Sequence, residues 1–101
     1  VQFAATLRSI WSEMIAALNH GNPLAAGYRL TGEAQAYFMP VFDTLNAKMP
    51  QIMASLSDLR LVEATCDVAE FLVTRTIDGE PNAYFVHFMR DGDGVWRVAG
   101  M

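Results

Sequence analysis

Residues 69–101 decide the fold of this chain, and they run AEFLVTRTIDGEPNAYFVHFMRDGDGVWRVAGM. Apolar and polar side chains alternate along most of this stretch, and it is rich in the β-branched and aromatic residues that strands favour. Asp, Gly and Asn cluster twice within it, and they tolerate the positive φ that tight hairpin turns need. Pro81 lacks an N–H group and is expected to lie in the first turn, outside the ladder. The stretch therefore predicts three antiparallel strands joined by two turns: strands at 69–77, 83–90 and 95–99, and turns at 78–82 and 91–94.

Both faces of the middle strand are largely apolar. One face carries Tyr84, Val86 and Phe88, and the other carries Phe85, His87 and Met89. We expect one of these faces to meet helices. The other face needs a partner or the curl of the sheet itself, because a large exposed apolar patch usually marks an interaction surface.

The composition indicates one ordered domain. The chain has 101 residues, of which 52% are hydrophobic, and a domain of this size buries roughly 60–70% of the surface of its unfolded chain. Because it begins at Val1 rather than Met, we expect residues 1–101 to be a single domain from a longer or processed precursor. The net charge is −4 without a basic run, which argues against a nucleic-acid partner. No apolar stretch approaches the ~20 residues that cross a bilayer, and the lone Cys66 permits no internal disulfide.

The amino-terminal half is predicted to be helical. Apolar residues recur with the helical period through 2–19, which indicates a long amphipathic helix. Gly21 can take the left-handed conformation that ends it. Asn22 and Pro23 then predict a second, shorter helix, as its N-cap and its first residue.

Two further prolines punctuate the segment before the first strand. A helical turn or two is expected at 33–38, and Pro40 should end or kink it or else open a helix at 40–47. Pro50 is expected to open a last helix, at 50–56. The apolar stripe of this region is expected to include Phe38, Val41, Phe42, Leu45, Met49, Ile52, Met53 and Leu56.

A fourth strand is predicted at 59–65, ahead of the other three. Simple alternation places Leu61 and Glu63 on one of its faces. Helices thus come first and strands last, and such segregated runs are typical of α+β folds. The predicted fold is a set of amino-terminal helices packed on a curved, four-stranded antiparallel meander.

The chain resembles the nuclear transport factor 2-like (cystatin-like α+β) superfamily. The ending FVHFMRDGDGVWRV, residues 85–98, is similar to a close that is common there. More narrowly, the chain resembles small uncharacterised bacterial domains at the carboxyl ends of secreted or surface proteins. The matching positions are Trp11, Met14, Ala17, Leu18, Gly21, Asn22, Tyr37, Phe42, Leu45, Ala69, Glu70, Tyr84, Phe88, Asp91, Gly94 and Trp96.

The resemblance implies a cone-like fold and an exported protein, in the periplasm or at the cell surface. It specifies activity less closely, because the matched residues are core and turn positions. Isomerase-like and dehydratase-like members of the superfamily carry Asp, His or Tyr at pocket positions from several elements. No such set can be matched in this sequence.

A few side chains are candidates for a site. His87 and Tyr84 are weak catalytic candidates, since imidazole titrates near neutrality and serves as a general base. Two histidines far apart in sequence do not supply the spacing of a zinc site, and no cofactor is predicted. The candidates for lining a ligand pocket are Trp11, Tyr37, Phe42, Tyr84, His87 and Arg97.

Charged residues of the sheet give alternative interpretations. Arg75, Arg90 and Arg97 fall on successive strands and could gather around an anion, but cross-strand pairing with Glu63 or Glu70 is the favoured interpretation. The alternation of Asp and Gly through 91–94 faintly suggests a calcium loop. It lacks the distal ligands of one, so a hairpin turn is favoured.

The favoured hypothesis is a non-catalytic interaction domain that self-associates through its sheet or docks on the rest of its parent protein. The alternatives are a small isomerase or cyclase that uses the cone pocket, and a carrier of a small apolar ligand. An isomerase requires His87 to line a closed apolar cavity of about 300 Å³ or more. A homodimer requires one sheet face to stay apolar and uncovered.

Overall fold

The computed structural model describes the backbone of residues 2–101 and the side chains from Ala4 onward. Its first element is the helix α1 (Gln2–Asn19), as the apolar spacing predicts. Gly21 adopts a φ of +69° and ends the helix. The N–H groups of Gly21 and Asn22 donate to the carbonyls of Leu18 and Ala17, at 3.2 and 2.9 Å. This pair of bonds satisfies carbonyls that the helix end would otherwise leave free.

Two helices follow, and each begins at a side-chain cap. Asn22 accepts a hydrogen bond from the N–H of Ala25 at the start of α2 (Pro23–Gly27). Thr31 accepts one from the N–H of Ala34 at the start of α3 (Gly32–Thr44). A side-chain oxygen at this position satisfies a backbone donor that has no partner within the helix.

The expected end of a helix at Pro40, and the alternative start of one there, are wrong, because α3 runs through this residue without ending. Proline removes the N–H that would bond to the carbonyl of Ala36. Both residues are exposed, so water can satisfy that carbonyl. A 3₁₀ turn (η1, Asn46–Lys48) then leads into α4 (Met49–Ala54), where Pro50 lies at the helix start as predicted.

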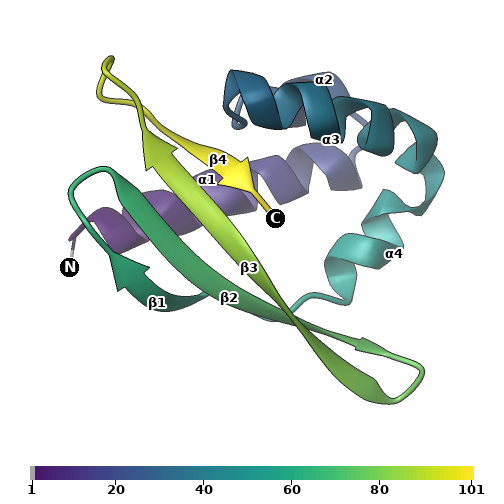
Figure 1. Cartoon of the computed structure of the whole chain (residues 1–101). Helices are drawn as coiled ribbons and strands as arrows, with labels where there is room; N and C mark the ends of the chain where they lie inside the picture. The colour runs from purple at the N-terminus through teal and green to yellow at the C-terminus, as the bar shows by residue number, and fades with distance from the viewer. Residues whose placement is uncertain (1) are drawn as a thin grey trace.

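The carboxyl-terminal half is the predicted four-stranded antiparallel meander, in the order β1-β2-β3-β4. Its strands are β1 (Arg60–Ala64), β2 (Val68–Ile77), β3 (Glu80–Arg90) and β4 (Trp96–Gly100). Figure 1 shows the β2–β3 hairpin extending past the end of β4. The arrangement confirms the α+β class and the order of elements.

The first hairpin turn is shorter than predicted. Only Asp78 and Gly79 form it, with φ of 51° and 81°, which is typical of a two-residue turn between twisted strands. Pro81 therefore lies inside β3, opposite Thr76, and its expected exclusion from the strand is wrong. Thr74 turns its N–H and carbonyl away from β3, toward Ser57. By the alternation of an antiparallel ladder, the nitrogen of Pro81 also points away from β2, so the hairpin loses no bond there.

The predicted alternation in β1 is also wrong at one position. The register passes from Leu61 opposite Phe71 to Glu63 opposite Glu70, with a bulge between. A bulge inserts one residue and reverses the alternation beyond it. Glu63 therefore shares a face with Glu70, while Leu61 packs against the core.

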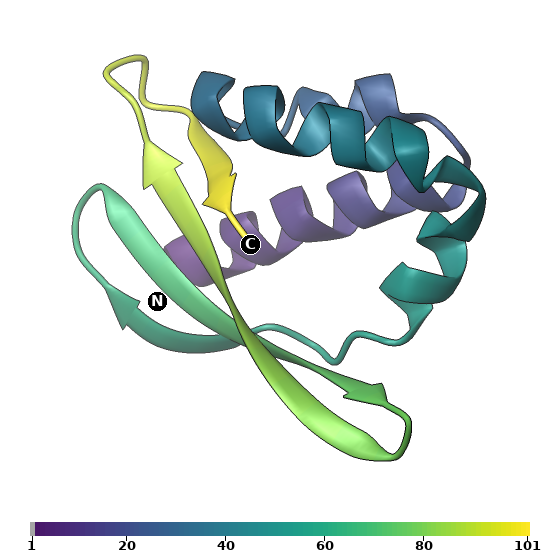
Figure 2. The ribbon, with the colours of Figure 1, turned by 45° about the vertical axis from the view of Figure 1, so that its right-hand side comes forward.

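The core lies between α1 and the inner face of the sheet. Leu7, Trp11, Met14 and Leu18 of α1 are buried. The inner face contributes Ala69, Phe71, Val73, Val86, Phe88 and Val98, which are buried as well. The helices lie on this one side of the sheet (Figures 1 and 2). In the apolar stripe, Phe42 and Met49 are buried as expected, whereas Val41 is 38% exposed.

Candidate functional site

The outer face of the sheet is the face that the helices leave uncovered. We define it by Val68, Glu70 and Leu72 on β2 and Phe85, His87 and Met89 on β3. These residues form three cross-strand pairs: Val68 with Met89, Glu70 with His87, and Leu72 with Phe85. The polar pair thus lies between two apolar pairs.

The apolar members of the outer face are open to solvent. Phe85 is 50% exposed, and Val68 and Met89 are each 42% exposed. Scattered single apolar residues are normal on a protein surface, whereas a contiguous patch usually marks an interaction site. Here Glu70 and His87 separate the apolar residues into two cross-strand pairs, Val68 with Met89 and Leu72 with Phe85, and Leu72 is only partly exposed.

The Glu70–His87 pair places polar groups at the centre of the outer face. The Nδ1 atom of His87 lies 3.5 Å from a carboxylate oxygen of Glu70, and both side chains are partly exposed. Glu63 lies opposite Glu70 on the neighbouring strand β1. Two carboxylates and one imidazole therefore cross the sheet in a row.

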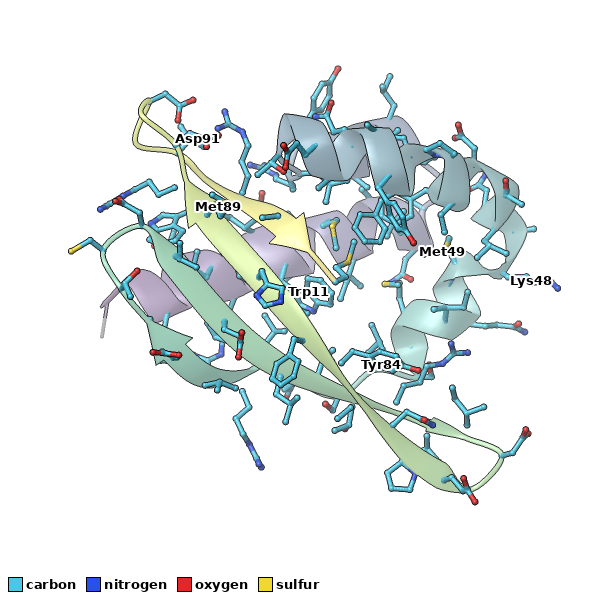
Figure 3. All side chains as sticks on the ribbon, in the orientation of Figure 1. Trp11, Lys48, Met49, Tyr84, Met89 and Asp91 are labelled. Carbon is cyan, nitrogen blue, oxygen red and sulfur yellow. The ribbon has the colours of Figure 1, made fainter. Side chains whose placement is uncertain are left out.

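An ion-pair cluster holds the β3–β4 hairpin at one end of the outer face. Arg97 lies opposite Met89, and it contacts carboxylate oxygens of Asp91 and Asp93 at 3.3 and 3.1 Å. The hydrogen bond from Arg97 holds the pKa of the Asp93 carboxyl below its ordinary value of 3.8, and a second bond, from the N–H of Val95, acts in the same direction. The bond to Asp93 in turn raises the pKa of Arg97. Figure 3 shows Met89 and Asp91 together at this end of β3.

The three sheet arginines do not gather around an anion. Arg90 pairs with Asp67 at 3.2 Å, and Arg97 pairs with the two aspartates of the hairpin. The favoured prediction, that these arginines pair across the strands with Glu63 or Glu70, is therefore wrong. Arg75 alternates with the outer-face residues of β2, and no hydrogen-bond partner is found for its buried Nε among the described residues. The carboxylates within the β1–β2 and β3–β4 connections lie closer to Arg90 and Arg97 than the carboxylates of the strands do.

The predicted catalytic candidates do not converge. Tyr84 lies opposite the buried Val73 and extends toward α4 (Figure 3). His87 belongs to the outer face, on the other side of the same strand. An odd separation along a strand places side chains on opposite faces, so these two residues cannot share one cavity.

The remaining pocket candidates are scattered. Trp11 and Phe42 are core residues with little exposed surface, whereas Tyr37 is 70% exposed on α3. Arg97 is occupied by its two aspartates. Of the six candidates, Trp11 also borders an open cleft between α1 and α4. This cleft was not predicted, because its lining comes from segments far apart in sequence.

In residues 2–101, none of the helices is long and apolar enough to span a membrane. In the same residues, His, Cys, Asp and Glu do not form a group of three or more suited to a metal ion.

Comparison with known proteins adds no relative: no family model, no curated protein and no solved structure matches this chain.

Proposed function

We propose that this chain is a non-catalytic interaction module that forms a homodimer through its outer face. The observation that carries the proposal is two apolar cross-strand pairs, Val68 with Met89 and Leu72 with Phe85, on a sheet face without a helical cover. Val68, Phe85 and Met89 are each more than 40% exposed. The resemblance to nuclear transport factor 2-like proteins motivates a cone-like scaffold and an exported location. Both of these stay predictions.

Charge favours a second copy as the occupant. In a two-fold interface, a residue i of one copy that contacts a residue j of the second copy implies that residue j of the first copy contacts residue i of the second. If the axis passes near the centre of the outer face, His87 of each copy approaches Glu70 of the other. The carboxylate of each Glu70 then gains a second hydrogen-bond donor, and the apolar pairs on either side meet their counterparts. The surface is in this sense complementary to itself.

The size of the outer face predicts a weak dimer. The outer-face positions cover five residues of β2, which span about 17 Å, and two strands, which span about 10 Å, so the flat footprint is near 170 Å². Side-chain relief increases this area, but it stays below the ~800 Å² per partner of a standard stable interface. We therefore expect a dissociation constant in the micromolar range.

The geometry gives less support to the isomerase alternative. That hypothesis needs His87 beside an acidic residue inside an apolar cavity. The carboxylate beside His87 is Glu70, and the pair faces outward with both side chains partly exposed. A paired and hydrated imidazole suits an interface better than a reaction chamber.

Sedimentation velocity from about 10 μM to about 1 mM tests the proposal across the predicted range. We expect a concentration-dependent shift from monomer to dimer. Amide chemical-shift changes over the same range should map to β2 and β3 at the outer-face positions. A monomer at every concentration, or changes confined to the helices, would overturn the proposal.

A further inference from the structure

Two open clefts meet at the connector between α4 and β1. One, of about 530 Å³, lies between α1, α4 and the connector. The other, of about 450 Å³, lies between the connector, the start of β1 and the edge of β2. Arg8, Ser57, Asp58 and Leu59 line both. We call the two together the connector groove, since they share this wall.

The two ends of the groove differ in chemistry. The end between α1 and α4 presents the apolar side chains of Trp11, Ile15, Met53 and Leu56, interspersed with polar ones such as Ser12 and Asn19. The end beside the sheet contains two arginines, Arg8 and Arg60, together with Thr74. An apolar end that adjoins a cationic end suits a ligand with a tail and a negative head.

Both groove arginines lack a carboxylate partner among the described side chains. Arg29, Arg90 and Arg97 each pair with an acidic side chain, but no salt bridge is found for Arg8 or Arg60 in residues 4–101. An arginine without an acidic partner stands out in this chain, because acidic residues outnumber basic ones by eleven to seven. Two guanidinium groups without a salt bridge therefore contribute positive charge to the second cleft.

Packing positions Arg8 within the groove. Its guanidinium carbon lies 5.6 Å from the centre of the Phe71 ring, and Nη2 is 3.4 Å from the carbonyl oxygen of Leu59. These contacts hold the side chain along α1 and leave further N–H donors for a ligand. A planar guanidinium matches a carboxylate in geometry as well as charge.

We infer that the connector groove binds a small amphipathic monocarboxylate. The carboxylate head would lie between Arg8 and Arg60, and the apolar tail would lie along Trp11 and Ile15 toward α4. Asp58 lines both clefts, and its negative charge opposes the head. Removal of this charge should therefore tighten binding, which a purely apolar site would not show. The inference does not depend on the dimer, because α1 and the connector supply most of the groove.

Titration of the ¹⁵N-labelled protein with octanoate, monitored by amide chemical shifts, tests the inference. Octanol and octylammonium serve as matched probes with the same tail. We expect octanoate to shift amides of α1 and of the connector, and to bind at least about fivefold more tightly than octanol. Octylammonium should bind more weakly than octanol, because the cationic end repels it.

Arg60 is the most useful position to change, because it is exposed and its loss should leave the fold intact. Arg60→Gln should weaken octanoate binding by about two- to fivefold and leave octanol binding unchanged. Asp58→Asn should strengthen octanoate binding by a similar factor. Arg29→Gln is the matched control, because Arg29 pairs with Glu13 and does not line either cleft.

The possible results distinguish the ligand site from the homodimer. Equal affinity for the three probes, an unchanged affinity in Arg60→Gln, or shifts confined to outer-face residues other than Leu72, which itself lines the second cleft, would each overturn the inference. A monomeric protein that binds octanoate with the predicted charge dependence would reject the homodimer and retain the ligand site. A dimer without octanoate binding would do the reverse.

Discussion

Replacement of Phe85 by lysine should disrupt the dimer. Phe85 is 50% exposed in the monomer, so dimerisation can bury about half of the roughly 200 Å² that a phenylalanine side chain offers. At ~25 cal/mol per Å², this amounts to about 2.5 kcal/mol per copy and about 5 kcal/mol per symmetric dimer. The loss of side-chain freedom at the interface and the incomplete desolvation of polar groups reduce the free-energy change that is measured. We therefore expect the dissociation constant to rise by at least about 100-fold, since each 1.4 kcal/mol is a factor of ten.

Sedimentation equilibrium measures this change directly, and thermal unfolding followed by circular dichroism checks the fold. Tyr37→Lys is the matched control, because Tyr37 is also an aromatic residue and is 70% exposed on α3, away from the outer face. Its substitution should leave the dissociation constant unchanged. Met89→Lys provides a second test on the outer face if Phe85→Lys reduces stability.

Equal association of Phe85→Lys and of the unmodified chain would contradict an interface on the outer face. Dissociation of the dimer by Tyr37→Lys but not by Phe85→Lys would contradict it equally, because the interface would then lie on the helical layer.

Three further changes test the fold and its electrostatics. Phe71→Ala should cost about 3–5 kcal/mol of unfolding free energy in chemical denaturation, because it opens a cavity at a fully buried ring; a loss below about 1 kcal/mol would contradict the assigned core. Pro40→Ala should instead stabilise the chain by about 2 kcal/mol in the same assay, since it restores a helix hydrogen bond at some cost in unfolded-state entropy, and any destabilisation would argue against a continuous α3. The lowered pKa of Asp93 means that its contribution is present at neutral pH and is lost as pH falls through the folded-state pKa, below 3.8. The amide shift of Val95 should titrate there and stay flat in Asp93→Asn.

Local sequence determined most of the secondary structure. The period of the apolar residues in 2–19 sufficed for α1, because a helix with one apolar stripe has a single way to bury it. Asn22 and Gly21 marked helix boundaries through interactions with their nearest neighbours. Alternation along β3 likewise separated Val86 and Phe88 from Phe85 and His87, since the period of a strand is two.

Pairing between segments decided what local patterns could not. The bulge that reverses Glu63 depends on the register of β1 against β2, and the place of Pro81 inside β3 depends on which side of the hairpin stays unpaired. Likewise, the helix can continue through Pro40 because the carbonyl of Ala36, which loses its N–H partner there, belongs to an exposed residue rather than to the core.

The candidate sites divide in the same way. The two apolar faces of β3 could be recognised from residues 83–90 alone. The partners of Arg90 and Arg97, and the meeting of Arg8 with Asp58 and Arg60 around one groove, could not. Alternation and helical period report only which side of its own element a residue occupies. Which distant side chains then face it depends on how the helices pack across the sheet, and that is a property of the folded chain alone.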